Sequence, residues 1–224
     1  DLQDFLCAMG CQVKGAGSST ICIQGRSPTR DARHTVMPDR IVAATYLAAA
    51  AAAGGEVELT QVHPGHLSTV TAALHAAGCQ IYSGEGRIVL RSEGRLRSIG
   101  TVRTAPYPGF PTDAQAILMA ALLRGQGSTV FVENIFENRY RHVDELCRMG
   151  ADIRVADRVA VVTGVPCLCG ASVRCTDLRG GAALLVAGAA AQGETRIGDI
   201  FHIQRGYQDP VGDLRQLGAR IETG

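Results

Sequence analysis

The sequence predicts an α/β protein built from βαβαββ units around a pseudo-threefold axis. A Leu-x-x-x-Gly phrase, followed by a small residue and then an aliphatic one, occurs four times, with its glycines at 10, 78, 150 and 218. The steps of 68, 72 and 68 residues between these positions indicate one supersecondary unit used repeatedly. Each complete unit also places an aspartate before an Ala-rich helical stretch, and helical patterns alternate with short strands.

The first complete unit begins near Asp39. Residues 41–53 are strong helix formers, and Gly54 and Gly55 end the expected helix. The rest of the unit is expected to form a strand at 57–62, a helix at 66–77 and two strands at 80–83 and 87–91 around a glycine-containing turn.

The second and third units repeat this order of elements. Lead-in strands are expected at 101–103 and 172–175, and each one leads into an aspartate, Asp113 or Asp177. The Ala-rich helices should be buried centrally with their first residues at a common end, where helix N-termini favour anions. The further expected elements are helices at 113–123, 140–149, 177–191 and 210–217 and strands at 129–133, 152–155, 159–163 and 195–200.

The chain is expected to contain one lobe and the end of another. Residues 1–28 are predicted to be the tail of an earlier unit, with a helix that ends at Gly10, strands around 12–14 and 20–24, and a linker at 27–34. Residues 29–224 are predicted to form three repeats, about 29–95, 96–165 and 166–224. Because Asp1 falls in the middle of a repeat, we expect the chain to be a fragment of a longer protein.

Composition excludes several classes of function. The net charge is +1, so there is no electrostatic case for nucleic acid or for an acidic membrane surface. The longest apolar run, 41–53, is about half the length of a membrane span. No signal peptide is visible, and we expect a reducing, cytoplasmic location.

The sequence predicts no metal site. The eight cysteines match no zinc spacing, and the six histidines form no ligand pattern. Cys167-x-Cys169 stays open between a metal or redox pair and structural thiols. No Gly-rich phosphate loop of the P-loop type is present.

Residues 104–113 form the most unusual stretch. Three prolines predict a stiff, extended approach that ends at Thr112 and Asp113, where a helix starts. Asp113 is either a helix cap or a functional carboxylate, and the stiffness of the approach favours the second interpretation.

Four further stretches carry polar groups suited to recognition. The loop 133–139 follows a strand and is either a binding loop or a solvated one. Arg205 lies beside a glycine, where it can bind a phosphate or carboxylate with two N–H groups or form a surface ion pair. The remaining two stretches are 176–179 and 38–40, the latter being the counterpart of 112–114.

Taken together, these stretches resemble the UDP-N-acetylglucosamine 1-carboxyvinyltransferases, a family of enolpyruvyl transferases. Residues 104–113 and 133–139 are similar to two signatures of that family nearly letter for letter. The stretches 142–146, 176–179 and 205–207 match as well, and the similarity covers essentially the whole chain. The related shikimate-pathway synthase shares the repeats but is less similar in these segments.

The resemblance implies a fold of two lobes, each with three βαβαββ units, and an active site in the cleft between them. Residues 1–28 would then be the tail of the first lobe. The implied reaction moves the enolpyruvyl group of phosphoenolpyruvate to the 3-hydroxyl of UDP-N-acetylglucosamine and releases phosphate, through a tetrahedral intermediate. It is the first committed step of peptidoglycan synthesis, and no metal or organic cofactor is implied.

The resemblance also assigns a catalytic set. Asp113 matches the family's base, which binds the sugar as well, and a carboxylate at a rigid helix start suits that task. Arg205 matches an arginine that binds phosphoenolpyruvate and stabilises developing charge. Asp177 belongs to the same expected catalytic set, and with Arg179 it matches a second polar pair at the cleft.

The remaining matched residues are expected to bind substrate. Ile135 matches a residue whose backbone contacts the sugar nucleotide. Arg40 and Arg139 match arginines that face the cleft, and Arg179 joins them in the expected binding set.

One departure from the family pattern limits this chain. The family's proton donor, usually a cysteine on a mobile loop, belongs to the first lobe, and none of the eight cysteines here matches its position. The isolated chain is therefore expected to be inactive and to need the first lobe as its partner. Two alternatives stay open: a catalytically silent paralogue that binds sugar nucleotide, and another enolpyruvyl transferase, such as the shikimate-pathway type.

Overall fold

The computed structural model describes residues 1–223, which form two compact units, Asp1–Asp39 and Arg40–Gly224. The smaller unit ends at Asp39, beyond the boundary at residue 28 expected from the sequence. Its extended part stays attached because the Thr29 amide donates to the Met9 carbonyl at 2.9 Å and His34 contacts Asp1 at 2.8 Å. It contains α1 (Leu2–Ala8) and an antiparallel pair, β1 (Gln12–Lys14) and β2 (Cys22–Gln24).

The larger unit contains the three predicted helix-and-strand repeats. The division of the sequence into lobes and into repeats at the stated residues stays a prediction. The first repeat contains α2 (Arg40–Ala53), β3 (Gly55–Thr60), the 3-10 helix η1 (Pro64–Leu67), α3 (Ser68–Ala76), β4 (Gln80–Gly84) and β5 (Arg87–Ser92). The second contains β6 (Gly100–Arg103), α4 (Thr112–Leu122), β7 (Ser128–Val132), α5 (Val143–Arg148), β8 (Asp152–Ala156) and β9 (Val159–Thr163). The third contains β10 (Ser172–Arg174), α6 (Leu178–Ala190), β11 (Arg196–Gly198), α7 (Phe201–Gln204) and α8 (Pro210–Gln216).

The strands form a separate sheet for each repeat. In the first repeat the strand order is β3-β5-β4, with all pairs antiparallel, and in the second it is β6-β7-β9-β8, a mixed sheet. The lead-in strands pair in parallel with the strand beyond the central helix, as β6 with β7 and β10 with β11. This parallel pairing places the carboxyl ends of β6 and β7 at one edge, where polar residues follow both strands.

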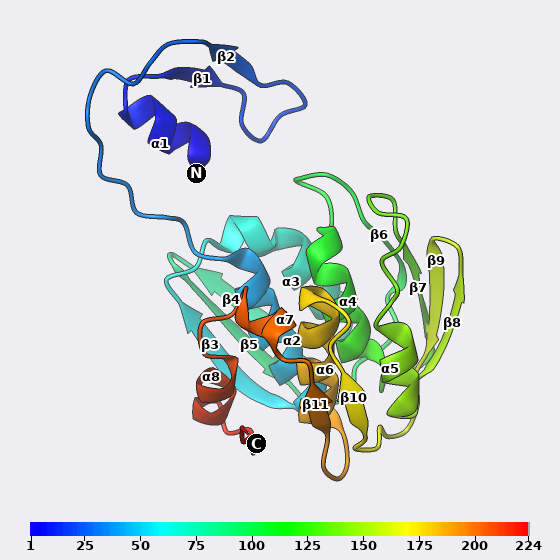
Figure 1. The fold of residues 1–224 in the computed structure, drawn as a ribbon. Coiled ribbons are helices and arrows are strands. Elements are labelled where there is room, and N and C mark those ends of the chain that lie inside the picture. Colours follow the sequence, from blue (N-terminus) through cyan, green and yellow to red (C-terminus); the bar gives the residue numbers. More distant parts are fainter. Residues whose placement is uncertain (224) are drawn as a thin grey trace. The chain divides into compact units, whose positions relative to one another are not determined.

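Three Ala-rich helices form the centre of the larger unit. Figure 1 shows α2, α4 and α6 side by side with the strands around them, and each of the three helices contacts the other two. Their small side chains, such as Ala48, Ala116 and Ala183, are almost fully buried and allow close approach of the helices. The predicted α/β layering with central helices is therefore confirmed.

Arg124 joins the carboxyl ends of the three central helices. It follows α4, and its Nη1 donates to the Ala52 carbonyl of α2 at 3.5 Å and to the Ala190 carbonyl of α6 at 3.2 Å. The three helices therefore end at the same place, where their last carbonyls carry partial negative charge. The guanidinium offsets that charge and satisfies two carbonyls that the helices leave without partners.

The Pro-rich stretch is a compact turn, so the prediction of an extended approach was wrong. The Ala105 amide donates to the Phe110 carbonyl at 3.0 Å, the Gly109 amide donates to the Pro106 carbonyl at 2.8 Å, and the Tyr107–Pro108 peptide bond is cis. A Cβ at Gly109 would lie 2.5 Å from the Cβ of Ala105, so the turn closes this tightly only with glycine there.

Several element boundaries differ from the prediction. Helix α5 starts at Val143, not at residue 140, because the Tyr140 hydroxyl donates to the Phe131 carbonyl at 3.1 Å and holds this residue against β7. The helix expected at 66–77 begins with η1 before α3 continues. The strand expected at 195–200 ends at Gly198, and the short helix α7 follows it without having been predicted.

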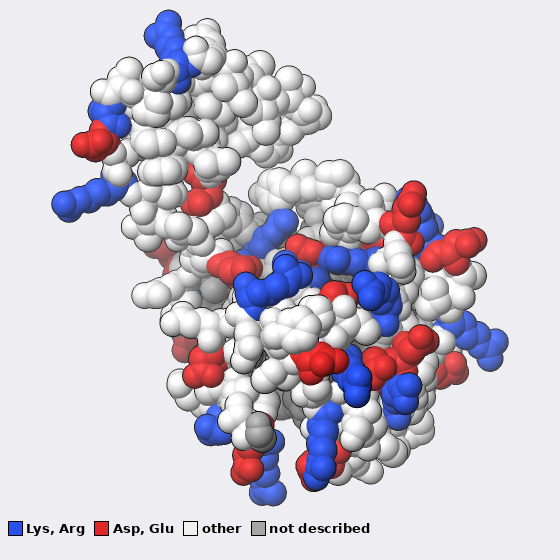
Figure 2. All heavy atoms as spheres, viewed as in Figure 1, with Lys and Arg blue, Asp and Glu red and all other residues white. Residues whose placement is uncertain are grey.

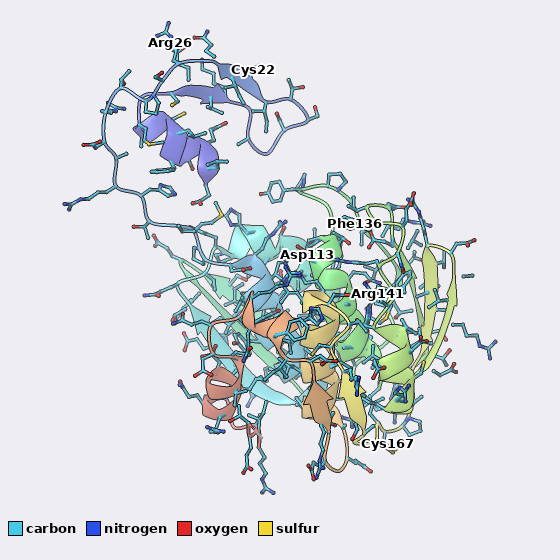
Figure 3. All side chains as sticks on the ribbon, in the orientation of Figure 1. Cys22, Arg26, Asp113, Phe136, Arg141 and Cys167 are labelled. Atoms are coloured by element: carbon cyan, nitrogen blue, oxygen red, sulfur yellow. The ribbon has the colours of Figure 1, made fainter. Side chains whose placement is uncertain are left out.

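Residues 1–223 contain no membrane-spanning helix and no disulfide. None of their helices combines the length and the apolar character that a bilayer crossing requires. All eight cysteines are free thiols, and these residues contain no group of three His, Cys, Asp or Glu side chains arranged to hold a metal ion. Figure 3 shows Cys167 at the opposite end of the larger unit from Asp113.

Candidate active site

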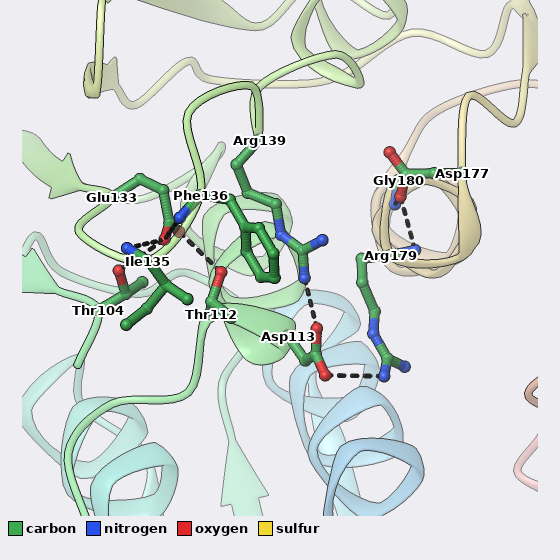
Figure 4. Close-up of polar contacts among 10 residues, drawn as sticks. All are labelled: Thr104, Thr112, Asp113, Glu133, Ile135, Phe136, Arg139, Asp177, Arg179 and Gly180. Atoms are coloured by element: carbon green, nitrogen blue, oxygen red, sulfur yellow. Dashed lines mark hydrogen bonds and ion pairs between the residues drawn. The ribbon is translucent and has the colours of Figure 1, made fainter. Parts of the chain in front are cut away.

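Asp113 lies between two arginines from different segments. Its Oδ1 accepts a hydrogen bond from Arg139, which follows β7, and its Oδ2 accepts one at 3.0 Å from Arg179, near the start of α6. The two arginine side chains are only 17% and 19% exposed, while Asp113 is 39% exposed. Figure 4 shows the carboxylate between the two guanidinium groups. The Asp113 carboxylate thus connects the start of α4 with the loop of Arg139 in the same repeat and with Arg179 in the third repeat.

The pKa of Asp113 lies below its ordinary value. Burial raises this pKa, but the hydrogen bonds and charges of Arg179 and Arg139 lower it by more than burial raises it. The carboxylate therefore stays ionised at neutral pH. Because the folded pKa is lowered, its stabilising contribution is present above the ordinary pKa and is lost as the pH falls through the folded value.

Asp113 and Asp177 have different local roles. Helix α4 begins at Thr112 after Pro111, and no side-chain hydrogen bond caps it. The capping interpretation of Asp113 is therefore wrong. Asp177 is the cap of α6, because its Oδ1 accepts from the amides of Arg179 and Gly180, both at 2.8 Å. It fixes the first turn that carries Arg179.

Arg205 lies near the start of α6. It directly follows α7, which packs against α6. A Cβ at the next residue, Gly206, would be only 2.7 Å from Leu178, so this backbone passes close to the first turn of α6. The Arg205 side chain is exposed.

Arg40 begins α2 and lies over the ring of Tyr107, 5.5 Å from its centroid. Tyr107 belongs to the Pro-rich turn that leads into α4, so the turn bridges the starts of α2 and α4. Figure 2 shows Lys or Arg and Asp or Glu side chains gathered where Figure 1 draws the first turns of α4 and α6.

Glu133 is a buried carboxylate beside this cluster that the sequence analysis did not select as a site residue. It is 1% exposed, and its oxygens accept from the hydroxyls of Thr104 and Thr112, both at 2.9 Å. The amides of Ile135 and Phe136 donate to its Oε1 at 2.8 and 3.1 Å. The sequence contained a hint that Thr104 and Glu133 lie close together. They directly follow two strands that a βαβ connection makes parallel neighbours.

Ile135 is positioned by this network. Its amide is used by Glu133, and its side chain is 38% exposed beside Phe136. The Phe136 ring in turn lies 5.1 Å from the guanidinium of Arg139. An open hollow of about 540 Å³ borders Arg139, Arg141 and Thr176.

His142 is a second buried polar residue near the cluster. It is 1% exposed. A Cβ at Gly180 would lie 2.9 Å from the Cβ of His142, so only glycine at that position allows α6 to come this close to His142. Burial lowers the pKa of His142 to about 4, although the charge of Asp177 acts in the opposite direction. The imidazole is therefore neutral at physiological pH.

Because His142 is neutral in the folded protein, we expect the free energy of unfolding to fall in mild acid. Unfolded His142 binds a proton near its ordinary pKa of about 6.5, whereas the folded residue does so only near 4, so stability falls as the pH drops between these values. Between pH 7 and pH 5 we expect a loss of roughly 2 kcal/mol from this group. Urea unfolding of His142→Asn should show a correspondingly flatter pH dependence. The exposed His75→Asn should keep the original slope, and equal slopes in all three proteins would contradict this account.

The site residues predicted from the sequence do not form one contact network in the structure. Asp113, Arg139 and Arg179 contact directly. Asp177 caps α6, and Arg205 lies beside the first turn of that helix. Arg40 lies at the start of α2.

Comparison with known proteins identifies the family. The sequence signature of EPSP synthase (3-phosphoshikimate 1-carboxyvinyltransferase) matches residues 1–222. The chain is 50% identical, over 99% of its length and 91% of the relative's, to a UDP-N-acetylglucosamine 1-carboxyvinyltransferase from Desulfofundulus thermocisternus. It is 46% identical to UDP-N-acetylglucosamine 1-carboxyvinyltransferase 1 from Caldanaerobacter subterraneus subsp. tengcongensis, over 99% of this chain and 53% of that protein.

A solved structure gives the same result. The crystal structure of the enolpyruvyl transferase NikO from Streptomyces tendae matches with a TM-score of 0.82 and 30% identity, over 96% of this chain and 52% of that one. The fold and these matches thus define the class of protein as the enolpyruvyl transferases. The chain belongs to the EPSP synthase family and, within it, to the UDP-N-acetylglucosamine 1-carboxyvinyltransferases, as the resemblance predicted. It spans about half the length of the Caldanaerobacter relative and of the NikO chain.

Proposed function

We propose that the chain provides one lobe of a two-lobed enzyme that transfers the enolpyruvyl group of phosphoenolpyruvate to the 3-hydroxyl of UDP-N-acetylglucosamine and releases phosphate. The observation that carries the proposal is the Asp113 carboxylate held by Arg139 and Arg179 at the starts of two central helices. The names of relatives at 46% and 50% identity support the choice of sugar nucleotide. A cytoplasmic location and a role in peptidoglycan synthesis belong to the same proposal.

Asp113 acts on the acceptor hydroxyl. Two arginines keep the carboxylate ionised and lower its basicity, so in the ground state it orients the hydroxyl by accepting a hydrogen bond. As the oxygen attacks the substituted carbon of phosphoenolpyruvate, the hydroxyl becomes acidic and its proton passes to the carboxylate. Substrate that displaces one arginine also raises the pKa of Asp113 and makes it a better base.

The arginines near these helix starts bind the anionic groups of phosphoenolpyruvate. Arg205, Arg179 and Arg40 lie at or near helix starts, where the helix macrodipole already favours negative charge. In the proposal Arg205 binds phosphoenolpyruvate through two N–H groups and stabilises the charge that develops as phosphate leaves. Asp177 contributes by fixing the first turn of α6, which carries Arg179.

The sugar nucleotide is held by the loop that follows β7. Ile135 is 38% exposed and lies next to the Asp113 cluster, so a sugar whose hydroxyl reaches Asp113 passes this residue. Acid–base groups and cations supply all the chemistry that the proposal requires from this lobe. The proton that the methylene carbon must gain comes from the other lobe.

The direct test is a phosphate-release assay with purified protein and phosphoenolpyruvate. We expect the two-lobed protein to release phosphate with UDP-N-acetylglucosamine and to form a product heavier by one enolpyruvyl group. The 224-residue chain alone should show no turnover above background, because the proton donor is expected in the other lobe. Normal turnover by the isolated chain would overturn the assignment of half an active site.

The acceptor distinguishes the alternatives in the same assay. Turnover with 3-phosphoshikimate and not with UDP-N-acetylglucosamine would replace the proposed reaction by that of the shikimate-pathway type. Binding of UDP-N-acetylglucosamine without phosphate release by the two-lobed protein would indicate the silent paralogue.

A further inference from the structure

We propose that Glu133 is a positioning residue that sets the geometry of the Asp113 site by tying together three segments of the chain. The inference rests on the proposed function for its kinetic consequences, while its geometric content stands on the contacts of Glu133 alone. It assigns Glu133 no contact with substrate.

The Glu133 carboxylate is buried and bonded by several donors. The side chain is 1% exposed and accepts four hydrogen bonds, two from hydroxyls and two from backbone amides. The Thr104 hydroxyl accepts from the Asn134 amide at 2.8 Å, so its single proton is directed to Glu133. A buried carboxylate with this many donors is a fixed reference point, because losing any one of them leaves a buried polar group without a partner.

The four hydrogen bonds of Glu133 connect three segments of the chain. Thr104 and Thr112 are the two ends of the Pro-rich turn, and both bind the same carboxylate. The amides of Ile135 and Phe136 begin the loop that continues to Arg139. Glu133 therefore sets the position of the residue before Asp113 and of the loop that carries the arginine bound to it. Figure 4 shows these contacts side by side.

The Thr112 hydroxyl positions the first turn of α4 and is not needed for the helix to fold. Helix α4 is buried along its length against α2 and α6, so its folding does not depend on the Thr112 hydroxyl. What that hydroxyl fixes is the first turn, where the carboxylate of Asp113 must meet the reacting hydroxyl within a few tenths of an ångström.

Thr112→Val tests this in the two-lobed protein, because it is nearly isosteric and removes one bond to Glu133. We expect kcat/KM for UDP-N-acetylglucosamine to fall by about tenfold to hundredfold, while KM for phosphoenolpyruvate changes less than about twofold. Thr71→Val, whose hydroxyl binds only carbonyls within its own helical segment, is the matched control and should behave as wild type. Equal behaviour of the two variants would overturn the proposal.

Glu133→Gln is the conservative variant. Its amide oxygen can accept the three bonds made to Oε1, and its amide nitrogen can donate to the Thr112 hydroxyl. We therefore expect it to retain activity within about threefold of wild type. A loss as large as that of Thr112→Val would mean that the charge of Glu133, and not its bonding, is what matters, and would contradict the proposal.

A readout without activity keeps the inference separate from the proposed function. Carbon-13 NMR titration of the Asp113 carboxyl should show a higher pKa in Thr112→Val than in wild type, because the contact with Arg139 loosens. In Thr71→Val the pKa should not move. If wild type fails to use UDP-N-acetylglucosamine but this shift appears, the proposed function fails and the positioning role stands. If turnover is present and the shift is absent, the positioning role fails.

Discussion

Asp113→Asn in the two-lobed protein is expected to lower kcat by about 10³-fold, the size of effect that a general base contributes. The amide cannot take the hydroxyl proton, and it removes the negative charge that Arg139 and Arg179 share. Two largely buried guanidinium groups then face each other without a counterion. Steady-state kinetics with both substrates, together with circular dichroism to check folding, measure the effect.

The matched control for this variant is Asp152→Asn, an exposed aspartate at the start of β8. It should keep kcat within about twofold of wild type, since surface substitutions of this kind have small effects. A folded Asp113→Asn protein with nearly full kcat would show that the carboxylate has no part in proton transfer.

Arg124→Met is expected to cost about 3 kcal/mol of stability, the largest effect we expect away from the site. The substitution keeps an apolar stem of similar length but leaves the Ala52 and Ala190 carbonyls without their cationic donor. The partial negative charge of three helix ends then has nothing to offset it. Chemical unfolding should show a lower midpoint, with a fall in Tm of several degrees for a domain of this size.

Arg91→Met is the comparison for the stability measurement. Arg91 lies on β5, is largely exposed and is 3.5 Å from Glu56, a type of surface ion pair that contributes little. We expect its unfolding midpoint to remain close to that of wild type. If the two variants unfold alike, Arg124 does not link the three helices energetically.

Most of the fold followed from local patterns. The Ala-rich runs were predicted as central helices because such small residues both favour helix and permit close packing, and glycines marked where they end. What failed depended on contacts between distant residues. The start of α5 is set by the bond of Tyr140 to β7, and the shape of the Pro-rich turn depends on the space that Gly109 leaves.

The sequence suggested which residues belong to the candidate site, but it did not suggest which of them bind each other. Asp113, Asp177 and Arg205 were expected to face one site, since helix starts in related repeats point the same way. That Arg139 reaches the other oxygen of Asp113 depends on the path of a loop, which the sequence does not reveal. The sequence placed Asp177 in the expected catalytic set but did not reveal that its Oδ1 caps α6. Glu133 was predicted only as part of the polar loop 133–139, because the four donors that surround it come from contacts that the sequence does not reveal.

A crystal structure of the two-lobed protein with bound UDP-N-acetylglucosamine tests the central claim most directly. We predict that the 3-hydroxyl oxygen of the sugar lies within about 3 Å of a carboxylate oxygen of Asp113, a hydrogen-bond distance. We also predict that the sugar passes the backbone of Ile135. A sugar ring bound elsewhere, with Asp113 still enclosed by Arg139 and Arg179 and out of reach of every sugar hydroxyl, would contradict the account.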